Sequence, residues 1–288
     1  MRPNALKTRI FLDSGDPAEA RAALALLGFL DGQTTNPSLI AKNPEALARK
    51  AAGNPFGPQE IWDFYRGVVR EISSLLPQGS VSIEVYADAA TTAKRMMEQV
   101  EECRAWIPNA HIKLPSTRQG LEAARLATAR AIPVNMTLCF TQAQAAAVHA
   151  ATRGASRGQV FVSPFIGRLD DKGENGMNLI ANVLKMFRQG ESHVEVLTAS
   201  VRSMEHFLYA LALGSDIITA PFSLLKAWAE KGLPVPGPEY VYDPKGLAPI
   251  PYVELSLEKP LEDYDVSHPL TDAGMAKFSA DWNALMGG

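Results

Sequence analysis

The chain is poor in cysteine and has no excess of either charge. It has two cysteines among 288 residues, Cys103 and Cys139, too few for a disulfide framework, and no histidine–cysteine cluster has zinc-ligand spacing, so we expect no metal. The 28 Lys and Arg nearly balance the 31 Asp and Glu, leaving a net charge of -3 and no basic run, so we expect no nucleic-acid partner. No apolar run could span a bilayer, and residues 1–9 lack the apolar core of a signal peptide, so we expect a cytoplasmic protein without a membrane partner.

Strand and helix patterns alternate along most of the sequence, which is 47% hydrophobic and 20% charged. Strands are expected over 10–13, 29–37 with its exit, 80–86, 111–114, 131–138, 159–163, 193–200 and 216–220. Each is followed by a helical pattern; Ser38 is expected to cap a helix over 39–51, and Asp88 a helix ending near Cys103. Eight such units in about 230 residues predict a (β/α)8 TIM barrel. A doubly wound sheet is the alternative, weakened because no GxGxxG or Walker motif occurs.

The character of the chain changes near Leu233, which divides it into an expected barrel over 1–232 and a tail over 233–288. Residues 234–270 carry eight prolines and predict an irregular segment. A stripe at helical spacing then predicts a C-terminal helix, formed by Met275, Phe278, Trp282 and Leu285. That helix must pack on its own barrel or on a neighbouring subunit, so a homo-oligomer stays open.

Lys113 is the anomaly of the predicted strands. It stands between Ile112 and Leu114, although lysine is depleted in strands and rarely buried. Burial favours the neutral form of an amine, which is how a nucleophilic, Schiff-base-forming lysine arises. The alternative is an ordinary lysine on an edge strand that reaches solvent.

Polar side chains recur where the other predicted strands end, and active sites of such barrels lie at the carboxyl ends of the strands. Besides Lys113, the set comprises Asp13, Asn36, Glu84, Asn135, Thr137, Ser163, Arg168, Ser200 and Arg202. Each alone has an ordinary explanation, such as a helix cap or a surface charge. Together they would surround one point with an amine, two carboxylates, hydroxyls and two guanidinium groups.

Five ordered motifs resemble those of the transaldolase family over roughly residues 10–221. They are Gly-Gln-Thr-Thr-Asn-Pro-Ser-Leu-Ile over 32–40, Ile-Lys-Leu-Pro-Ser-Thr over 112–117, Val-Asn-Met-Thr-Leu over 134–138, Ser-Pro-Phe-Ile-Gly-Arg over 163–168, and Ala-Ser-Val-Arg over 199–202. The sequence departs from the family at Gln33, where an aliphatic residue is usual, and the tail from Leu233 has no counterpart that we can place.

The resemblance implies a transaldolase that uses neither a metal nor an organic cofactor. Lys113 would form the Schiff base with a ketose, Glu84 and Thr137 would hold the proton-shuttling water, and Asp13 would be the general acid and base. Substrate contacts would come from Asn36 and Asn135 on the dihydroxyacetone hydroxyls, Ser163 and Ser200 nearby, and Arg168 and Arg202 on the phosphate. The implied partners are sugar phosphates of the pentose phosphate pathway.

Two alternatives remain beside transfer. A relative of the same fold cleaves fructose 6-phosphate as an aldolase and has Gln at the position of Glu84, which favours transfer for this chain. A non-catalytic barrel that binds sugar phosphates is the other alternative, although such a protein should have lost Lys113 or Asp13.

Overall fold

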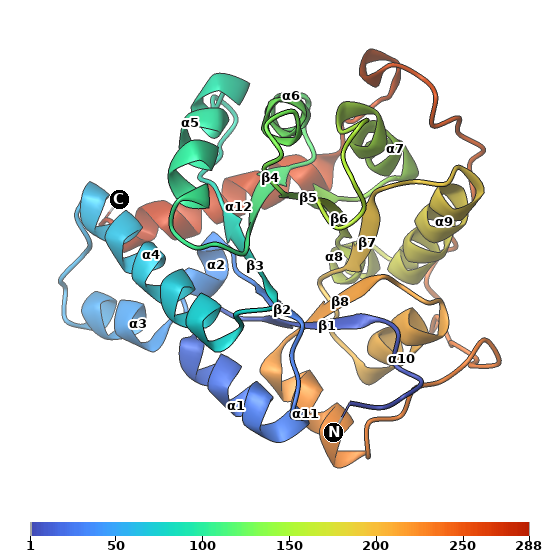
Figure 1. Cartoon of the computed structure of the whole chain (residues 1–288), viewed down its shortest axis with the longest axis horizontal. Coiled ribbons are helices and arrows are strands. Elements are labelled where there is room, and N and C mark those ends of the chain that lie inside the picture. The colour runs from blue at the N-terminus through green and yellow to red at the C-terminus, as the bar shows by residue number, and fades with distance from the viewer. Residues whose placement is uncertain (1, 288) are drawn as a thin grey trace.

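The computed structural model describes residues 2–287, in which eight parallel strands close into one barrel in chain order (Figure 1). The strands are β1 (Arg9–Asp13), β2 (Gly32–Thr34), β3 (Ser80–Glu84), β4 (Ala110–Pro115), β5 (Val134–Cys139), β6 (Val160–Pro164), β7 (Glu195–Thr198) and β8 (Ile217–Ala220). Each pairs with the next, and β8 pairs with β1. The predicted (β/α)8 TIM barrel is confirmed.

Helices surround the barrel on the outside (Figure 1). They are α1 (Pro17–Leu27), α2 (Pro37–Ile40), α3 (Pro44–Ala51), α4 (Pro58–Leu75), α5 (Ala93–Arg104), α6 (Arg118–Thr128), α7 (Gln142–Ala151), α8 (Ile166–Asp170), α9 (Gly176–Gln189), α10 (Met204–Ala212), α11 (Phe222–Glu230), the 3-10 turn η1 (Leu261–Asp263) and α12 (Pro269–Leu285). The short α8 follows β6 directly, and no periodic pattern in the sequence predicted it.

The cap of the helix after β2 is Asn36, and the prediction of Ser38 is wrong. The Asn36 Oδ1 accepts a hydrogen bond from the Leu39 N–H at 2.9 Å, so α2 begins one residue after Asn36. The Ser38 hydroxyl instead donates to the carboxylate of Asp281, on α12. This contact links α2 to the C-terminal helix.

Two other helix boundaries differ from the predicted ones. The expected helix over 39–51 is divided into α2 and α3, because Pro44 has no N–H to continue the first helix and is favoured at the start of the second. The expected cap Asp88 closes a turn by accepting from the Ala90 N–H, and Thr92 caps α5 by accepting from the Arg95 N–H. A strong capping residue marks a turn as readily as a helix.

Aromatic side chains fill the middle of the barrel. Successive side chains of a strand alternate between its two faces, so Phe11, His111 and Phe161 share the interior. The Phe11 and Phe161 rings meet edge to face with centroids 6.2 Å apart, and the His111 ring stacks on Phe161 at 4.0 Å. Gly32 leaves room for this layer, since a Cβ there would lie 2.6 Å from the Phe11 ring. The layer closes the barrel below the strand ends.

The segment between α11 and α12 passes along the outside of the barrel (Figure 1). Side chains of α9, α7 and α6 donate hydrogen bonds to successive backbone carbonyls of this segment. The bonds run from Asn182 to Ile250, from Gln142 to Val253 and from Arg118 to Leu261. These bonds replace those that regular secondary structure would supply, which explains how a proline-rich segment is held in one path.

Helix α12 packs against α2 and β5 of its own barrel. Of the predicted apolar stripe, Phe278, Trp282 and Leu285 are buried, while Met275 is half-buried. The Trp282 ring packs against Trp62 with centroids 5.0 Å apart. The helix therefore covers part of the carboxyl end of the barrel.

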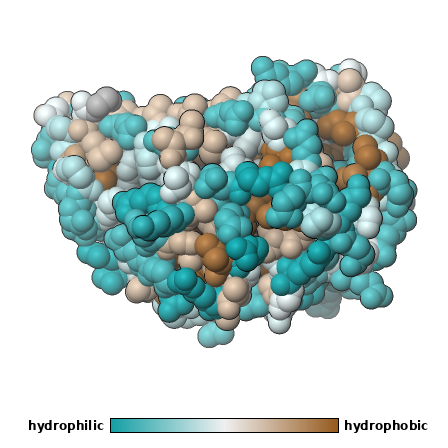
Figure 2. All heavy atoms as spheres, turned by 90° about the horizontal axis from the view of Figure 1, so that it is seen from above, coloured by the Kyte–Doolittle hydropathy of each residue, from teal (hydrophilic) through white to brown (hydrophobic). Residues whose placement is uncertain are grey.

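The surface is mostly hydrophilic on the face seen in Figure 2, where hydrophobic residues form small separate groups. Large exposed hydrophobic side chains over residues 2–287 are Leu26, Leu47, Val241 and Val253. Within the same residues, no helix combines the length and apolar character needed to cross a membrane.

Candidate active site

A cavity of about 270 Å³ lies at the carboxyl ends of the barrel strands. Seven of the ten predicted site residues line it, namely Asp13, Asn36, Lys113, Ser163, Arg168, Ser200 and Arg202. The other three, Glu84, Asn135 and Thr137, are buried on neighbouring strands. Residues separated by up to 189 positions in the chain thus lie around one small space, which suits a small-molecule ligand.

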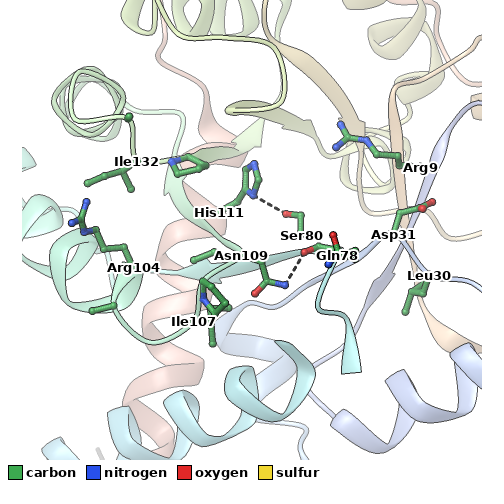
Figure 3. Close-up of a pocket in the computed structure, with 16 residues that line it drawn as sticks. Arg9, Leu30, Asp31, Gln78, Ser80, Arg104, Ile107, Asn109, His111 and Ile132 are labelled. Carbon is green, nitrogen blue, oxygen red and sulfur yellow. Dashed lines mark hydrogen bonds between the residues drawn. The ribbon is translucent and has the colours of Figure 1, made fainter. Parts of the chain in front are cut away.

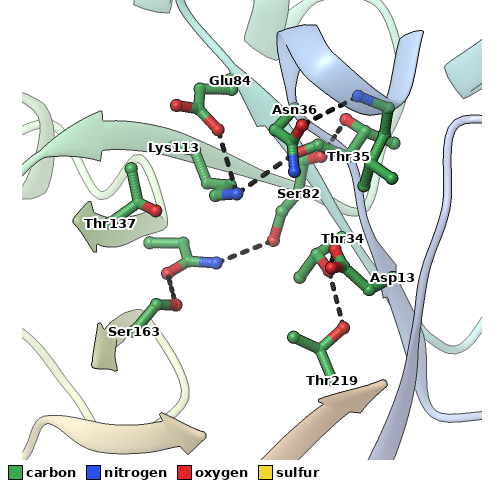
Figure 4. A network of polar contacts seen from close by, with 12 residues as sticks. Asp13, Thr34, Thr35, Asn36, Ser82, Glu84, Lys113, Thr137, Ser163 and Thr219 are labelled. Atoms are coloured by element: carbon green, nitrogen blue, oxygen red, sulfur yellow. Dashed lines mark hydrogen bonds and ion pairs between the residues drawn. The ribbon is translucent and has the colours of Figure 1, made fainter. Parts of the chain in front are cut away.

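Lys113 is buried, with 3% of its side chain exposed, and projects from β4 toward this space (Figure 4). Its Nζ lies 3.0 Å from Glu84 Oε2 and donates to the Thr35 carbonyl oxygen at 3.1 Å. The register explains the first contact, because Glu84 on β3 pairs directly with Lys113. A buried amine with one carboxylate and one carbonyl partner, facing a cavity, is arranged to meet an electrophile.

Both carboxyl groups of the site have altered acidity. Burial raises the pKa of Asp13 above its ordinary value, which the Lys113 amine and a 2.6 Å hydrogen bond from the Thr34 hydroxyl partly oppose. Burial likewise raises the pKa of Glu84, again opposed by Lys113. Raised carboxyl pKa values bring these groups closer to the range in which they exchange protons at neutral pH.

Strands β3, β5 and β6 are joined by a polar network on the same interior face (Figure 4). The Asn135 amide donates to Ser82 Oγ at 3.1 Å, and its carbonyl accepts from Ser163 Oγ at 2.6 Å. The Thr137 hydroxyl, two residues along β5, is buried without a hydrogen-bond partner among residues 2–287. Its hydroxyl is therefore free to bind a small polar molecule.

Two guanidinium groups stand at the mouth of the cavity. Arg168 on α8 lies over the rings of Phe165 and Phe278, at 5.6 and 5.4 Å from their centroids, and burial lowers its pKa below the ordinary value. Arg202 forms an ion pair with Asp171 and is about half-exposed. Neighbouring cations of this kind are suited to a phosphate group.

The backbone around these arginines is specialised. Ser200, two residues after the end of β7, has a φ of +59°, a conformation that non-glycine residues rarely adopt. Its carbonyl accepts a hydrogen bond from the Gly167 N–H at 3.1 Å. A Cβ at Gly167 would lie 2.4 Å from Arg202 Nε, so only glycine lets the two segments approach this closely.

Several cavity residues were missed by sequence reasoning. Lys42, Lys277 and Phe278 line the cavity, the last two from α12. Lys42 lies two residues after the 32–40 motif and could have been noticed as an additional cation beside it. Lys277 carried no local signal, because its position depends on where α12 packs.

A larger cavity of about 640 Å³ lies at the opposite, amino-terminal end of the barrel (Figure 3). Several of its polar groups already have protein partners: the His111 ring nitrogens contact Ser80 Oγ at 2.8 Å and the Gly158 carbonyl at 2.9 Å, and Arg9 forms an ion pair with Glu195 at 2.7 Å. Burial lowers the pKa of His111 to about 4, so the ring is neutral. The smaller cavity around Lys113 is therefore the candidate active site.

Comparison with known proteins identifies the family of the chain. The family model described as transaldolase/fructose-6-phosphate aldolase matches residues 10–288. The chain belongs to this family.

Relatives named "Probable transaldolase" match almost the whole chain. The protein from Dehalococcoides mccartyi is 33% identical over 277 residues, covering 96% of this chain and 99% of its own. Those from Brucella ovis and Mesorhizobium japonicum are 35% and 36% identical, each covering 95% of this chain and 96% of its own. The resemblance found from the motifs is confirmed, and the protein is an enzyme of the transaldolase type.

The family match continues to residue 288, so the tail from Leu233 does have a counterpart in the family. The alternative of a non-catalytic binding barrel is wrong, since the chain belongs to a family of enzymes.

Proposed function

We propose that the protein transfers a dihydroxyacetone unit from a ketose phosphate, fructose 6-phosphate or sedoheptulose 7-phosphate, to an aldose phosphate through a Schiff base on Lys113. The observation that carries the proposal is the Lys113 amine, buried beside Glu84 and facing the same cavity as Asp13 and two arginines. We place the reaction in the non-oxidative pentose phosphate pathway, in the cytoplasm, and the family resemblance supports this proposal.

Schiff-base formation begins when Lys113 Nζ attacks the C2 carbonyl carbon of the ketose. The resulting carbinolamine loses its hydroxyl as water and becomes the protonated imine. Glu84 and Thr137 hold the water molecule that carries protons in this step. The buried Thr137 hydroxyl, without a protein partner among the described residues, and the raised pKa of Glu84 support these roles.

Cleavage follows when Asp13 takes the proton of the C4 hydroxyl as the C3–C4 bond breaks. The electron pair of that bond moves into the imine, which becomes an enamine, and the aldose phosphate leaves. An acceptor aldose then reacts in the reverse direction, with Asp13 returning the proton. The raised pKa of Asp13 suits a group that must both take and return a proton near neutral pH.

Substrate binding uses the rest of the set. Arg168 and Arg202 hold the phosphate, with Ser200 beside them, while Asn36 and Asn135 bind hydroxyls of the dihydroxyacetone unit near Ser163. Asn36 keeps its amide NH2 for this purpose, since its carbonyl oxygen caps α2. No organic cofactor takes part in these steps.

Borohydride trapping tests the proposal. Incubation with fructose 6-phosphate and borohydride should attach a reduced three-carbon unit to Lys113, located by peptide mass spectrometry. Lys113→Met keeps the length of the side chain without its amine and should show neither adduct nor turnover. An adduct on another lysine, or turnover by the variant, would contradict the assignment.

A further inference from the structure

The hydroxyl of Tyr65, on the outer helix α4, lies between the two residues that hold the Lys113 amine. Tyr65 is fully buried, and its OH accepts a hydrogen bond from the Glu84 N–H at 2.9 Å. It also lies 2.5 Å from Thr35 Oγ1. Since the Thr35 hydroxyl gives its only proton to the Ser82 carbonyl at 2.7 Å, the Tyr65 hydroxyl must be the donor to Thr35.

This hydroxyl completes the sheet where its ladder ends. Strands β2 and β3 pair up to Thr34 and Ser82, and the Thr35 N–H still donates to the Ser82 carbonyl at 3.2 Å. The chain then turns into α2, so β2 offers no carbonyl to the Glu84 N–H. The Tyr65 oxygen accepts that hydrogen bond instead, which satisfies a buried donor.

Both partners of the Lys113 amine are fixed in this way. The Thr35 carbonyl and the Glu84 carboxylate lie 3.1 and 3.0 Å from Nζ, and Tyr65 binds the side chain of the first residue and the backbone of the second. Burial raises the pKa of Tyr65 above its ordinary value, so the phenol keeps its proton. The ring is braced by Trp106 and by Trp282 of α12, with centroids 5.7 and 5.8 Å away.

We propose that Tyr65 is a positioning residue that holds Glu84 and Thr35 at the distances from Lys113 Nζ needed for Schiff-base formation. The proposal rests on the proposed function of Lys113. Tyr65 is not among the residues that line the cavity, so its effect should fall on the geometry of the amine and not on the binding of phosphate. Displacement of a reacting group by about 1 Å can slow a reaction about a hundredfold.

Tyr65→Phe tests this, because it removes the hydroxyl and keeps the ring. The rate of borohydride trapping at Lys113 and kcat should fall about tenfold to a hundredfold, while inhibition by inorganic phosphate, a probe of the arginines, stays unchanged. Tyr264→Phe is the matched control: Tyr264 is also buried and its hydroxyl donates to the Ser256 carbonyl at 2.5 Å, but it lies in the tail. This control should match the wild type in all three measurements.

A second variant distinguishes the loss of this contact from misfolding of Tyr65→Phe. Thr35→Val removes the acceptor of the Tyr65 proton and should slow trapping similarly, and the double variant should be no slower than the slower single one, as expected for residues that act through one contact. Wild-type trapping rates in Tyr65→Phe, or equal losses in Tyr65→Phe and Tyr264→Phe, would overturn the positioning role while leaving the function intact. Absence of a Lys113 adduct in the wild type would overturn both.

Discussion

Arg168→Ala should weaken binding of phosphorylated substrates far more than it affects folding. Over residues 2–287, no carboxylate forms an ion pair with Arg168, and its guanidinium rests on the Phe165 and Phe278 rings. A half-buried cation without an acidic partner gains further stabilisation when an anion binds. Losing one charge-assisted hydrogen bond costs about 1.5–3 kcal/mol, which corresponds to about tenfold to 150-fold in affinity.

The assay compares two donors. For Arg168→Ala, kcat/KM with fructose 6-phosphate should fall by this factor, chiefly through KM, and unphosphorylated dihydroxyacetone should be affected much less. Arg202→Ala should show the same selectivity. The Asp171→Asn control removes the acid paired with Arg202, which frees that guanidinium for phosphate, so its KM for fructose 6-phosphate should stay equal or fall.

The reasoning fails under either of two results. Equal losses with the phosphorylated and the unphosphorylated donor would show that Arg168 does not bind phosphate. A rise in KM for Asp171→Asn as large as that for Arg168→Ala would show that the Arg202–Asp171 pair must be kept intact for binding.

Two further predictions concern the carboxylates. Glu84→Gln should slow transfer and raise the relative release of dihydroxyacetone, because an amide cannot pass protons to the water. The assay compares the formation of sedoheptulose 7-phosphate from fructose 6-phosphate and erythrose 4-phosphate with the release of glyceraldehyde 3-phosphate when no acceptor is present. An unchanged ratio of the two rates would refute this. Burial raises the pKa of Asp13 in the folded protein above its value in the unfolded chain. The free energy of unfolding therefore falls as the pH rises from the unfolded pKa through the folded pKa. Asp13→Asn should abolish turnover yet raise the melting temperature measured by calorimetry at pH 7, with less gain below about pH 4. A lower melting temperature at pH 7 would contradict this.

Strand alternation made much of the site predictable. Asn135 and Thr137 lie two apart on β5 and therefore share a face, and Lys113 on the next strand shares it too. A parallel barrel brings the carboxyl ends of all strands to one end, so the polar residues found there in sequence had to lie near one another. The proximity of these residues could be predicted from strand alternation and from closure of the barrel, while their chemical roles remain predictions.

Other features could not be predicted, for two different reasons. The Asn36 cap could have been predicted from its own segment, since Asn before Pro is a strong signal for a helix start, and the assignment to Ser38 is wrong. The position of Lys277 in the cavity could not be predicted from the sequence, because α12 is held by contacts with distant parts of the chain. Examples are the hydrogen bonds of Ser38 with Asp281 and of Thr271 with the Leu138 carbonyl. Side chains delivered to a site by such contacts have no signature in their own segment.

The layers of the barrel interior separate its two cavities. The stacked and edge-to-face rings of Phe11, His111 and Phe161 occupy the middle, between the cavity at the amino-terminal end and the polar network around Lys113. A buried ion pair and two carboxyl groups with raised pKa values are costly in such an interior, where aromatic packing would be more stable. The layer that opens toward the arginines and α12 carries this cost, so we expect substrate to enter from that end. The aromatic layer separates the Lys113 amine from the cavity at the amino-terminal end.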